Sequence, residues 1–405
     1  MSRTLFFSPF LLTFALAAAP ALAQETAPAA APSAQEAQTL VQDLARRVEK
    51  LESAPAKAGL NSFNPAIGMA IDGAFRDSND KAAFQFRAAE LNVEAPVDPH
   101  LKAWAVITGS NGGVDVEEAT LETTSLPYNL TVRGGRLFAN FGRMAHFHDH
   151  ELPVVDRPRS LDTYVGGEAQ ADGVETQWLV PAPFYLNATA GAYNKMGADN
   201  ARQGNQGQRP LDQFTYLGRV NTYADLTDDQ SVELGADSAW TPKRSVADTA
   251  GPGGAATGIV TRSGAWRTLS GVDLTYRYQP AQGGLYKGVT WGTEVLRNDE
   301  RRFDPVTNLP TGRVQAYAGY SYVEVKGGLR LRGGVMVDLT EDQDIAGKLT
   351  STYTGFLTYD VSEFQRLRLT YAEAITNVAG TPRDRTLALQ WTGVIGHHVH
   401  GFRDR

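Results

Sequence analysis

The 405-residue sequence contains no cysteine. This absence excludes disulfide frameworks, Cys-ligated zinc, iron–sulfur clusters and a thiol nucleophile, and it suits a protein that crosses an oxidising periplasm. Basic residues are in the minority, because 38 Lys and Arg stand against 45 Asp and Glu, for a net charge of −7. A nucleic-acid binder needs a basic surface to neutralise phosphates, so the composition argues against that class of protein.

Long apolar runs are missing beyond the first 23 residues. None approaches the roughly 20 residues that a membrane-spanning helix needs, which excludes a helical membrane protein. At the N-terminus, Arg3 is followed by the apolar run 5–19 and then by an Ala-x-Ala site. This order predicts a signal peptide over 1–23, cleaved after Ala23, and export through the inner membrane.

Two short segments follow the predicted signal peptide. Residues 24–34 are rich in Ala and Pro and predict a linker. Over 35–54 the apolar positions recur at spacings of 3, 4 and 3, which is typical of a coiled coil and predicts a periplasmic coiled-coil helix. Its apolar stripe would hold copies of the chain together, as in a homotrimer, or would lie against the barrel or the membrane as a solitary helix. The candidate oligomerisation residues are Val41, Leu44, Val48 and Leu51.

From residue 63 onward the apolar period changes to two, which is typical of β-strands. In 266–278, for example, Val272 and Tyr276 share one face while Asp273 and Arg277 share the other. About sixteen such segments follow one another, with errors of a few residues at each boundary. The expected strands are 64–76, 83–96, 99–110, 114–124, 129–141, 171–180, 184–195, 211–224, 228–240, 266–279, 286–298, 312–324, 327–338, 347–360, 363–375 and 383–395.

The connections between these segments alternate in length. A soluble sandwich has no reason to keep such an alternation, whereas a transmembrane barrel combines tight periplasmic turns with longer external loops and an even strand count. The short turns lie at 96–99, 126–129, 181–183, 227–229, 280–284, 326–328 and 361–363, and the longer loops include 142–170, 196–210, 241–265 and 299–311.

Lipid offers no hydrogen-bond partner to the backbone, so a membrane-spanning sheet must close on itself. We therefore expect an all-β fold, a transmembrane antiparallel β-barrel of about sixteen strands over 63–402. Its place is the outer membrane of a Gram-negative bacterium. Apolar side chains should face lipid, and the lumen of so wide a barrel should be polar and filled with water.

Several segments resemble one outer-membrane family. The opening segment Phe63 to Gly73, the Gly135-Arg136-Leu137-Phe138 strand, the His148-Asp149-His150 run with Asp156-Arg157-Pro158, and the end from Gly396 to Phe402 are similar to a proteobacterial family described as zinc-regulated or TonB-dependent receptor-like. The coiled-coil-then-barrel layout also resembles the phosphate-selective porins.

The length of the barrel segment favours a plugless channel over a true TonB-dependent receptor. A true TonB-dependent transporter holds a plug inside a 22-stranded barrel, and about 340 residues cannot supply both. Barrels of this kind usually end on the aromatic residue that the outer-membrane assembly machinery binds at the C-terminal strand. Here Phe402 is followed by Arg403-Asp404-Arg405, which departs from that pattern.

Three of the seven histidines lie at the start of the segment 142–170. Alternate residues of an extended chain point the same way, so His146, His148 and His150 with Asp156 are candidate zinc ligands. The alternative is a solvated loop that binds no metal, and the barrel itself requires no cofactor. A second histidine group, at 397–400, should face the periplasm.

The segment 142–170 is expected to fold inward and constrict the lumen, or else to project outward. Charged side chains on the polar strand faces should line the pore. Their arginines would favour anions unless the carboxylates beside them cancel the effect. The pore-lining candidates are Arg219, Arg277, Arg330, Arg332, Arg366, Arg368, Asp273 and Asp338.

The motifs G-x-S-x-G, H-E-x-x-H and G-x-x-x-x-G-K-[ST] are absent, so no catalytic residues are assigned and we expect no enzyme. A hydrolase built on His148 and Asp149 is the remaining catalytic alternative. The pattern favours a porin-like channel for passive diffusion of small hydrophilic solutes or ions. The second hypothesis is a receptor-like barrel that binds zinc at the cell surface. Outer-membrane lipid, the assembly machinery and further copies of the chain are the expected partners.

Overall fold

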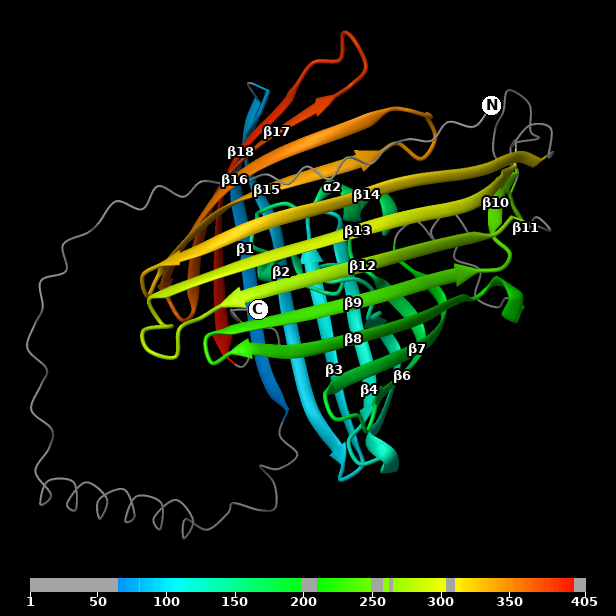
Figure 1. The fold of residues 1–405 in the computed structure, drawn as a ribbon, viewed down its shortest axis with the longest axis horizontal. Coiled ribbons are helices and arrows are strands. Elements are labelled where there is room, and N and C mark those ends of the chain that lie inside the picture. Colours follow the sequence, from blue (N-terminus) through cyan, green and yellow to red (C-terminus); the bar gives the residue numbers. More distant parts are fainter. Residues whose placement is uncertain are drawn as a thin grey trace, which may run out of the picture. The chain divides into compact units, whose positions relative to one another are not determined.

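The computed structural model describes residues 65–79, 81–197, 210–248, 258–261, 265–303 and 310–396. Within these ranges, sixteen antiparallel strands form a closed barrel (Figure 1). They are β1 (Ala66–Ser78), β2 (Lys81–Asp98), β3 (Leu101–Ser110), β4 (Gly113–Thr123), β5 (Leu130–Phe138), β6 (Gln170–Leu179), β7 (Tyr185–Met196), β8 (Thr215–Thr227), β9 (Gln230–Thr241), β12 (Arg267–Tyr278), β13 (Lys287–Phe303), β14 (Pro310–Gly327), β15 (Leu331–Glu341), β16 (Leu349–Ser362), β17 (Gln365–Thr376) and β18 (Asp384–Gly396). A separate hairpin pairs β10 (Ser245–Asp248) with β11 (Gly258–Thr261).

The barrel closes where the first strand meets the last. β1 pairs antiparallel with β18, from Gly68 opposite Gly396 to Ser78 opposite Thr386. Every barrel strand then has two neighbours, so the wall satisfies its backbone groups without water. In Figure 1 the blue and cyan strands pass behind the green and yellow ones at a steep angle, as tilted barrel strands do. The predicted fold is confirmed, and each of the sixteen expected segments overlaps a barrel strand.

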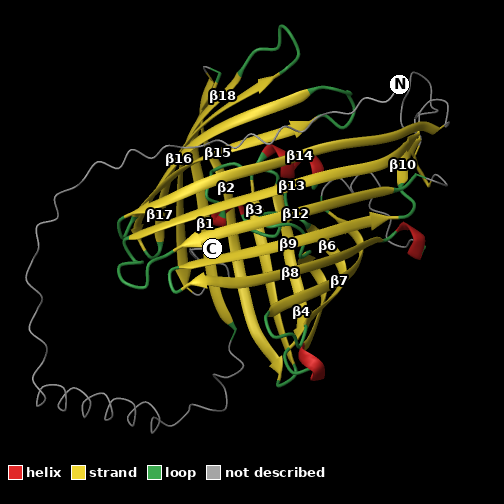
Figure 2. Ribbon diagram, viewed as in Figure 1, coloured by secondary structure: helices red, strands yellow, loops and turns green. Residues whose placement is uncertain are grey.

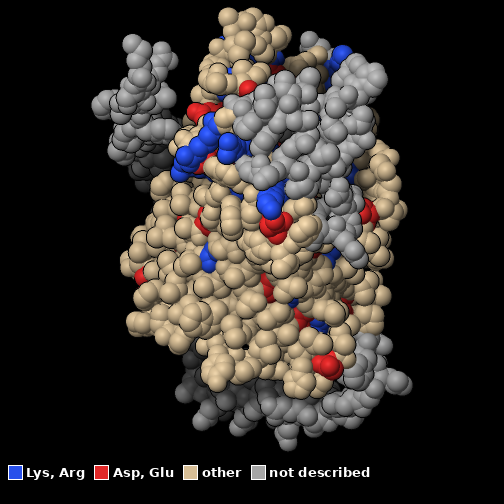
Figure 3. Space-filling view, turned by 90° about the vertical axis from the view of Figure 1, so that its right-hand side faces the viewer, with Lys and Arg blue, Asp and Glu red and all other residues tan. Residues whose placement is uncertain are grey.

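Side chains alternate between the two faces of the wall. On β12, Val272 is 55% exposed on the outer face, whereas Asp273 and Thr275 are buried on the inner face. Leu389 and Trp391 of β18 are likewise exposed on the outside. Figure 3 shows one side of the barrel, which is covered mainly by uncharged residues. The outer surface therefore suits contact with hydrocarbon.

The two ends of the barrel carry different connections. At one end, which we call the turn end, β8 and β9 are joined by 228–229 and β16 and β17 by 363–364. The opposite end, the loop end, carries the segments 139–169, 197–214 and 242–266. Two connections at the loop end are nevertheless short, since 79–80 joins β1 to β2 and 111–112 joins β3 to β4.

The described helices are short (Figure 2). They are η2 (Pro127–Asn129), η3 (Asp149–Glu151), α2 (Arg159–Tyr164) and η5 (Leu211–Gln213). None of them is long and apolar enough to cross a membrane. Two of them, η3 and α2, belong to the segment 139–169, which we call the inner loop.

Several predictions concern residues outside the described part of the chain. They are the signal peptide 1–23, the linker 24–34, the coiled-coil helix 35–54 and the histidine group at 397–400. These stay predictions, and so does the oligomerisation role of Val41, Leu44, Val48 and Leu51.

Replacing Val272 with Arg places a charge in the middle of the outer face of β12. We expect the free energy of unfolding from lipid vesicles to fall by about 2–4 kcal/mol, the cost of arginine at the bilayer midplane. Leu285→Arg, in the turn between β12 and β13, is the matched control and should cost at most about 1 kcal/mol. Urea unfolding of the refolded barrel measures both, and equal losses would contradict the assignment of this face to lipid.

Candidate functional site

The inner loop leaves β5, folds into the barrel and returns to β6. Its apolar side chains are almost fully buried and pack in one cluster with apolar residues on the inner face of β12–β16. The expectation of a polar, water-filled lumen is wrong for this part of the barrel. An alternation of period two shows which side chains point inward, but it does not show which groups they contact there. The cluster includes Phe141, Met144, Leu152, Leu161 and Tyr164 of the loop, and Leu269, Leu296, Tyr322, Met336 and Phe356 of the wall.

Carboxylates on the opposite wall bind the start of the inner loop through its backbone. Gly142 donates its N–H to Asp237 at 3.0 Å, and Arg143 donates its N–H to Glu294 at 3.2 Å. Hydrogen bonds to ionised acceptors are stronger than neutral ones, and a buried N–H group needs a partner. These two carboxylates therefore hold the loop across the lumen, against β9 and β13.

The helix α2 is held by β12 and β15. The backbone N–H of Ser160 donates to Asp338 at 2.9 Å, and the hydroxyl of Tyr164 donates to the carbonyl of Glu341 at 3.1 Å. The guanidinium of Arg267 donates to the carbonyl of Tyr164 at 2.7 Å, at the end of the helix. Asp338, predicted to line the pore, is 2% exposed and anchors α2 instead.

Arg219 and Asp273 also lie on the inner wall beneath the inner loop. Nη1 of Arg219 is 2.6 Å from Asp237 and 2.7 Å from Asp273, and none of the three side chains is more than 4% exposed. Asp237 is the residue that accepts the Gly142 N–H group. In contrast to the prediction, Arg219 and Asp273 therefore do not face open space. With Asp237 they form a buried ion triad in which one guanidinium pairs with two carboxylates.

Arginines gather between the inner loop and the turn end. Nη2 of Arg332 lies 3.0 Å from Asp360, and Nε of Arg366 lies 2.7 Å from the same carboxylate. Together with Arg143 of the loop and Arg368, they line a small cavity of about 30 Å³ bounded by β14–β17. We call Arg143, Arg332, Arg366 and Arg368 the arginine cluster. Two of its guanidinium groups share Asp360, Arg332 also lies 3.8 Å from Glu324, and Glu151 lines the same cavity, so carboxylates offset most of the positive charge of this region.

The two remaining predicted arginines lie elsewhere. Arg277 is near the turn end of β12, where its guanidinium is 3.6 Å from Glu233. Arg330 lies in the turn before β15 and is exposed, so it belongs to the rim and not to the lumen. The expected strand 327–338 begins at Leu331, and this later start places Arg330 outside the wall.

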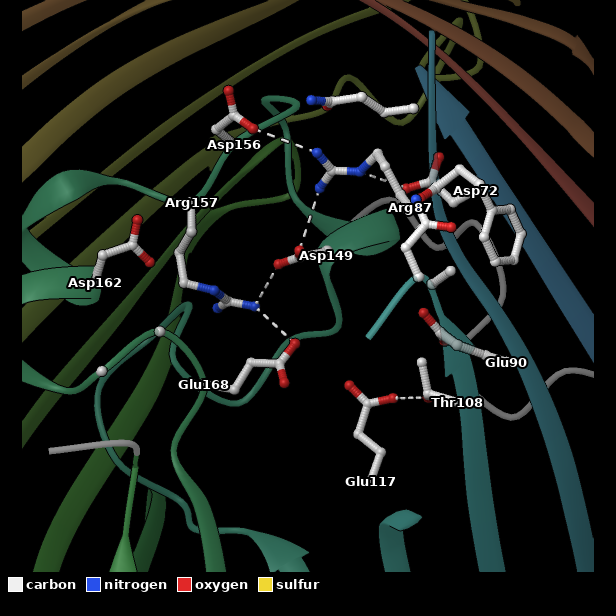
Figure 4. A pocket seen from close by; sticks show the side chains of 16 residues that line it. Asp72, Arg87, Glu90, Thr108, Glu117, Asp149, Asp156, Arg157, Asp162 and Glu168 are labelled. Carbon is white, nitrogen blue, oxygen red and sulfur yellow. Dashed lines mark hydrogen bonds and ion pairs between the residues drawn. The ribbon is translucent and has the colours of Figure 1, made fainter. Parts of the chain in front are cut away.

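A second cavity, of about 660 Å³, lies between the inner loop and β1–β4, on the side of the loop end (Figure 4). Two guanidinium groups, those of Arg87 and Arg157, reach into it. Arg87 lies 3.2 Å from Asp149, and Arg157 lies 3.1 Å from Glu168. Seven carboxylates line this space, which we call the acidic cavity: Asp72, Glu90, Glu117, Asp149, Asp156, Asp162 and Glu168.

His148 lies fully buried where the inner loop meets the wall. Its ring stacks on that of His150, with centroids 5.6 Å apart. Nδ1 of His148 is 3.7 Å from Glu90 and 3.5 Å from Glu117, while Nε2 is 3.6 Å from Glu118. Burial alone would lower the pKa of His148, but these carboxylates outweigh it and raise the pKa well above its ordinary value.

The structure does not bring together the four predicted zinc ligands. The ring of His146 packs edge-on against Phe147, and Asp156 forms ion pairs with Arg76 and Arg87. The prediction assumed an extended chain, whereas η3 turns the chain at 149–151. The catalytic alternative finds no support either, because Asp149 pairs with arginines while His148 faces glutamates.

The sequence analysis missed the glutamates that surround His148. Glu117 and Glu118 are consecutive, yet both reach His148 because β4 carries a β-bulge: Glu118 lies opposite Val106 while Val116 lies opposite Ile107. A bulge re-aims one side chain and leaves no mark in a pattern of period two. For these glutamates the sequence offered one indication, which is the charged residues on the inward face of β2, where Glu90 lies.

Comparisons with known proteins agree with the fold. No family model matches the chain. An uncharacterized protein of Aquifex aeolicus (strain VF5) is 28% identical over 359 residues, which cover 80% of this chain and 71% of that protein.

Solved structures with a similar fold come from several bacteria. OprB of Pseudomonas putida matches with a TM-score of 0.56 at 12% identity, over 86% of this chain and 96% of that one. An anion-selective porin from Comamonas acidovorans matches with a TM-score of 0.54 at 12% identity, over 82% and 99%. OmpT of Vibrio cholerae, described as a trimer form, matches with a TM-score of 0.52 at 12% identity, over 82% and 99%.

At these identities the likeness shows the fold: the chain has the sixteen-stranded barrel architecture of outer-membrane porins. The resemblance to the zinc-regulated or TonB-dependent receptor-like family stays a prediction.

Gly142 has φ of +60°, and a Cβ added there would lie 2.1 Å from Glu294. Gly142→Val should therefore free the inner loop from β13 and expose Arg143 to trypsin. Gly347→Val is the matched control, because Gly347 also has positive φ, +80°, but meets nothing within 4 Å. It should suffer only the backbone strain of about 1–2 kcal/mol.

Limited digestion of the refolded barrel, followed by mass spectrometry, measures cleavage after Arg143. We expect a rate at least about tenfold higher in Gly142→Val than in the control, which corresponds to about 1.4 kcal/mol of loop opening. Equal protection in the two variants would show that the Gly142 contact does not hold the loop.

Proposed function

We propose that the protein is an outer-membrane channel for passive diffusion of small hydrophilic solutes or ions, narrowed by the inner loop. One observation carries the proposal. The inner loop lies inside a closed sixteen-stranded barrel and is hydrogen-bonded to Asp237, Glu294 and Asp338 on the far wall. A segment fixed in the lumen limits the size and charge of what passes.

The outer surface supports the proposed location. Val272, Leu389 and Trp391 present apolar side chains outward, and the sheet has no open edge. The turn end suits the periplasmic side and the loop end suits the exterior, as in transmembrane barrels generally. A Gram-negative outer membrane is the membrane that such barrels occupy.

The distribution of charged side chains along the lumen supports a channel that selects solutes by their charge. A solute entering from the loop end meets the acidic cavity first, and the arginine cluster lies beyond the inner loop. Narrow spaces with low-dielectric walls focus the fields of such groups. We infer that the inner loop separates a cation-attracting compartment from one lined by arginines and their paired carboxylates.

A homotrimer is the assembly that we propose. The OmpT structure described as a trimer form has the same barrel architecture. The predicted coiled-coil stripe of Val41, Leu44, Val48 and Leu51 would supply a contact between copies on the periplasmic side.

Removing residues 144–165 from the inner loop tests the proposed constriction. Single-channel conductance in planar bilayers should rise at least about twofold, because the removed segment occupies the lumen. Removing 378–382 from the exposed connection between β17 and β18 is the control and should leave conductance unchanged. An electrically silent intact barrel, or equal conductance before and after the inner deletion, would refute the channel.

Arg366→Gln removes one positive charge from the arginine cluster. We expect the zero-current potential in a salt gradient to shift towards cation preference, because the focused field of the lumen loses a cationic group. Arg330→Gln removes the same charge from the exposed rim and should shift the potential far less. If the two variants shift it equally, the arginine cluster does not lie on the ion path.

A further inference from the structure

Three residues from separate parts of the chain converge beside the acidic cavity. Glu90 comes from β2, Glu117 from β4 and His148 from the inner loop, and one ligand atom of each lies within 4.8 Å of the other two. Their side chains are 7%, 14% and 0% exposed. We propose that these residues bind a divalent transition-metal cation of the zinc class, which fastens the inner loop to the wall.

The spacing of the donor atoms fits a shared cation. Nδ1 of His148 lies 3.5 Å from Oε1 of Glu117 and 3.7 Å from Oε2 of Glu90. These separations exceed the usual 2.7–3.2 Å of a direct hydrogen bond. A tetrahedral zinc with bonds of about 2.1 Å places neighbouring donors about 3.4 Å apart. The spacing of these donor atoms is therefore compatible with one edge of a coordination shell.

Further side chains orient the three ligands. When Nδ1 of His148 binds a metal, Nε2 carries the proton, and it lies 3.6 Å from Oε2 of Glu118. A carboxylate behind the second ring nitrogen is the usual arrangement for a metal-bound histidine. Glu118 is held in turn by the indole of Trp104 at 3.2 Å and by the N–H of Phe138 at 3.3 Å.

The other two ligands are also positioned. The hydroxyl of Thr108 donates to Glu117, and a ring nitrogen of His150 lies 3.2 Å from Glu90. The β-bulge in β4 is what aims Glu117 at His148. Bulges occur preferentially beside functional sites, where they redirect a side chain.

Charge and access favour the same conclusion. Burying several carboxylates together is costly unless a positive charge compensates them, and a divalent cation supplies two. Glu90 and Glu117 also line the acidic cavity, so a cation can reach them from the loop end and retain water as a further ligand. The imidazole favours zinc and similar transition metals over calcium and magnesium, which prefer all-oxygen shells.

The proposed site differs from the one that the histidine spacing predicts. It keeps His148, leaves out His146 and Asp156, and takes its carboxylates from β2 and β4. His150 orients Glu90 and is not required as a ligand. Because the ligands join the loop to two strands, binding stiffens the loop whether or not solutes pass through the lumen.

The test uses the full-length chain, refolded in detergent and treated with a chelator. Equilibrium dialysis against zinc chloride, with elemental analysis, should find one tightly bound ion per chain. Glu117→Gln should lower the affinity at least about tenfold. This conservative change keeps the acceptor for Thr108, and circular dichroism checks the barrel. His148→Gln should have the same effect.

Two control variants distinguish coordination of zinc by the three ligands from general electrostatic attraction of zinc to the acidic cavity. Glu168→Gln removes a charge from the same cavity but lies outside the donor group, and His146→Gln removes a neighbouring imidazole. Both should bind zinc like the parent chain. Cobalt(II) provides a second readout, since its visible spectrum should report a nitrogen and oxygen shell that Glu117→Gln abolishes.

Several results would overturn the site. They are the absence of stoichiometric binding, unchanged affinity in Glu117→Gln, or equal weakening by Glu168→Gln, which would indicate a diffuse acidic surface. In each case His148 and His150 would instead be protonated counter-ions of the surrounding glutamates. Dialysis does not depend on conductance, so its outcome is independent of the channel function.

Discussion

This structure depends on one constraint: each backbone N–H and C=O group of the barrel wall must find its hydrogen-bond partner within the protein, because the surrounding lipid offers none. Lipid cannot pair with an exposed N–H or C=O group, so β1 must meet β18 and the sheet must close. Closure fixes the rest of the wall. Inward and outward residues alternate, and many of the outer ones are large apolar side chains. A barrel of sixteen strands is too wide for the inward side chains of its wall to fill, so the lumen either stays open or is occupied by another part of the chain.

The inner loop occupies part of this lumen, and its own backbone groups also need hydrogen-bond partners there. A loop buried inside a barrel carries N–H groups that water no longer reaches, and the wall supplies acceptors for them. Asp237, Glu294 and Asp338 each accept a backbone N–H from the loop. Much of the inward charge on the far wall therefore serves loop docking. The acidic cavity and the arginine cluster lie on opposite faces of the loop, and the four arginines of the cluster are each less than 9% exposed.

Patterns of neighbouring residues in the sequence predicted the strands of the barrel wall, but they did not predict the contacts inside the barrel. The period of two and the alternating connections predicted each barrel strand, because both are set by residues adjacent in sequence. Contacts across the lumen join residues far apart, as Ser160 and Asp338 do at a separation of 178 residues. The sequence therefore placed Arg219, Asp273 and Asp338 correctly on the inner face but could not show that the loop covers them. It singled out His148 but not its neighbours Glu117 and Glu118, because one extra residue in β4 changes which side chains face inward.

The links 79–80 and 111–112, which join β1 to β2 and β3 to β4 at the loop end, are only two residues long. Gln85, Phe86 and Asn111, in or near these links, belong to the lining of the acidic cavity. The carboxylates of this cavity therefore lie on the side of the loop end where β1–β4 carry only these short links. Small cations that enter at the loop end would be attracted by these carboxylates, and the rate of their arrival would fall as ionic strength screens the field.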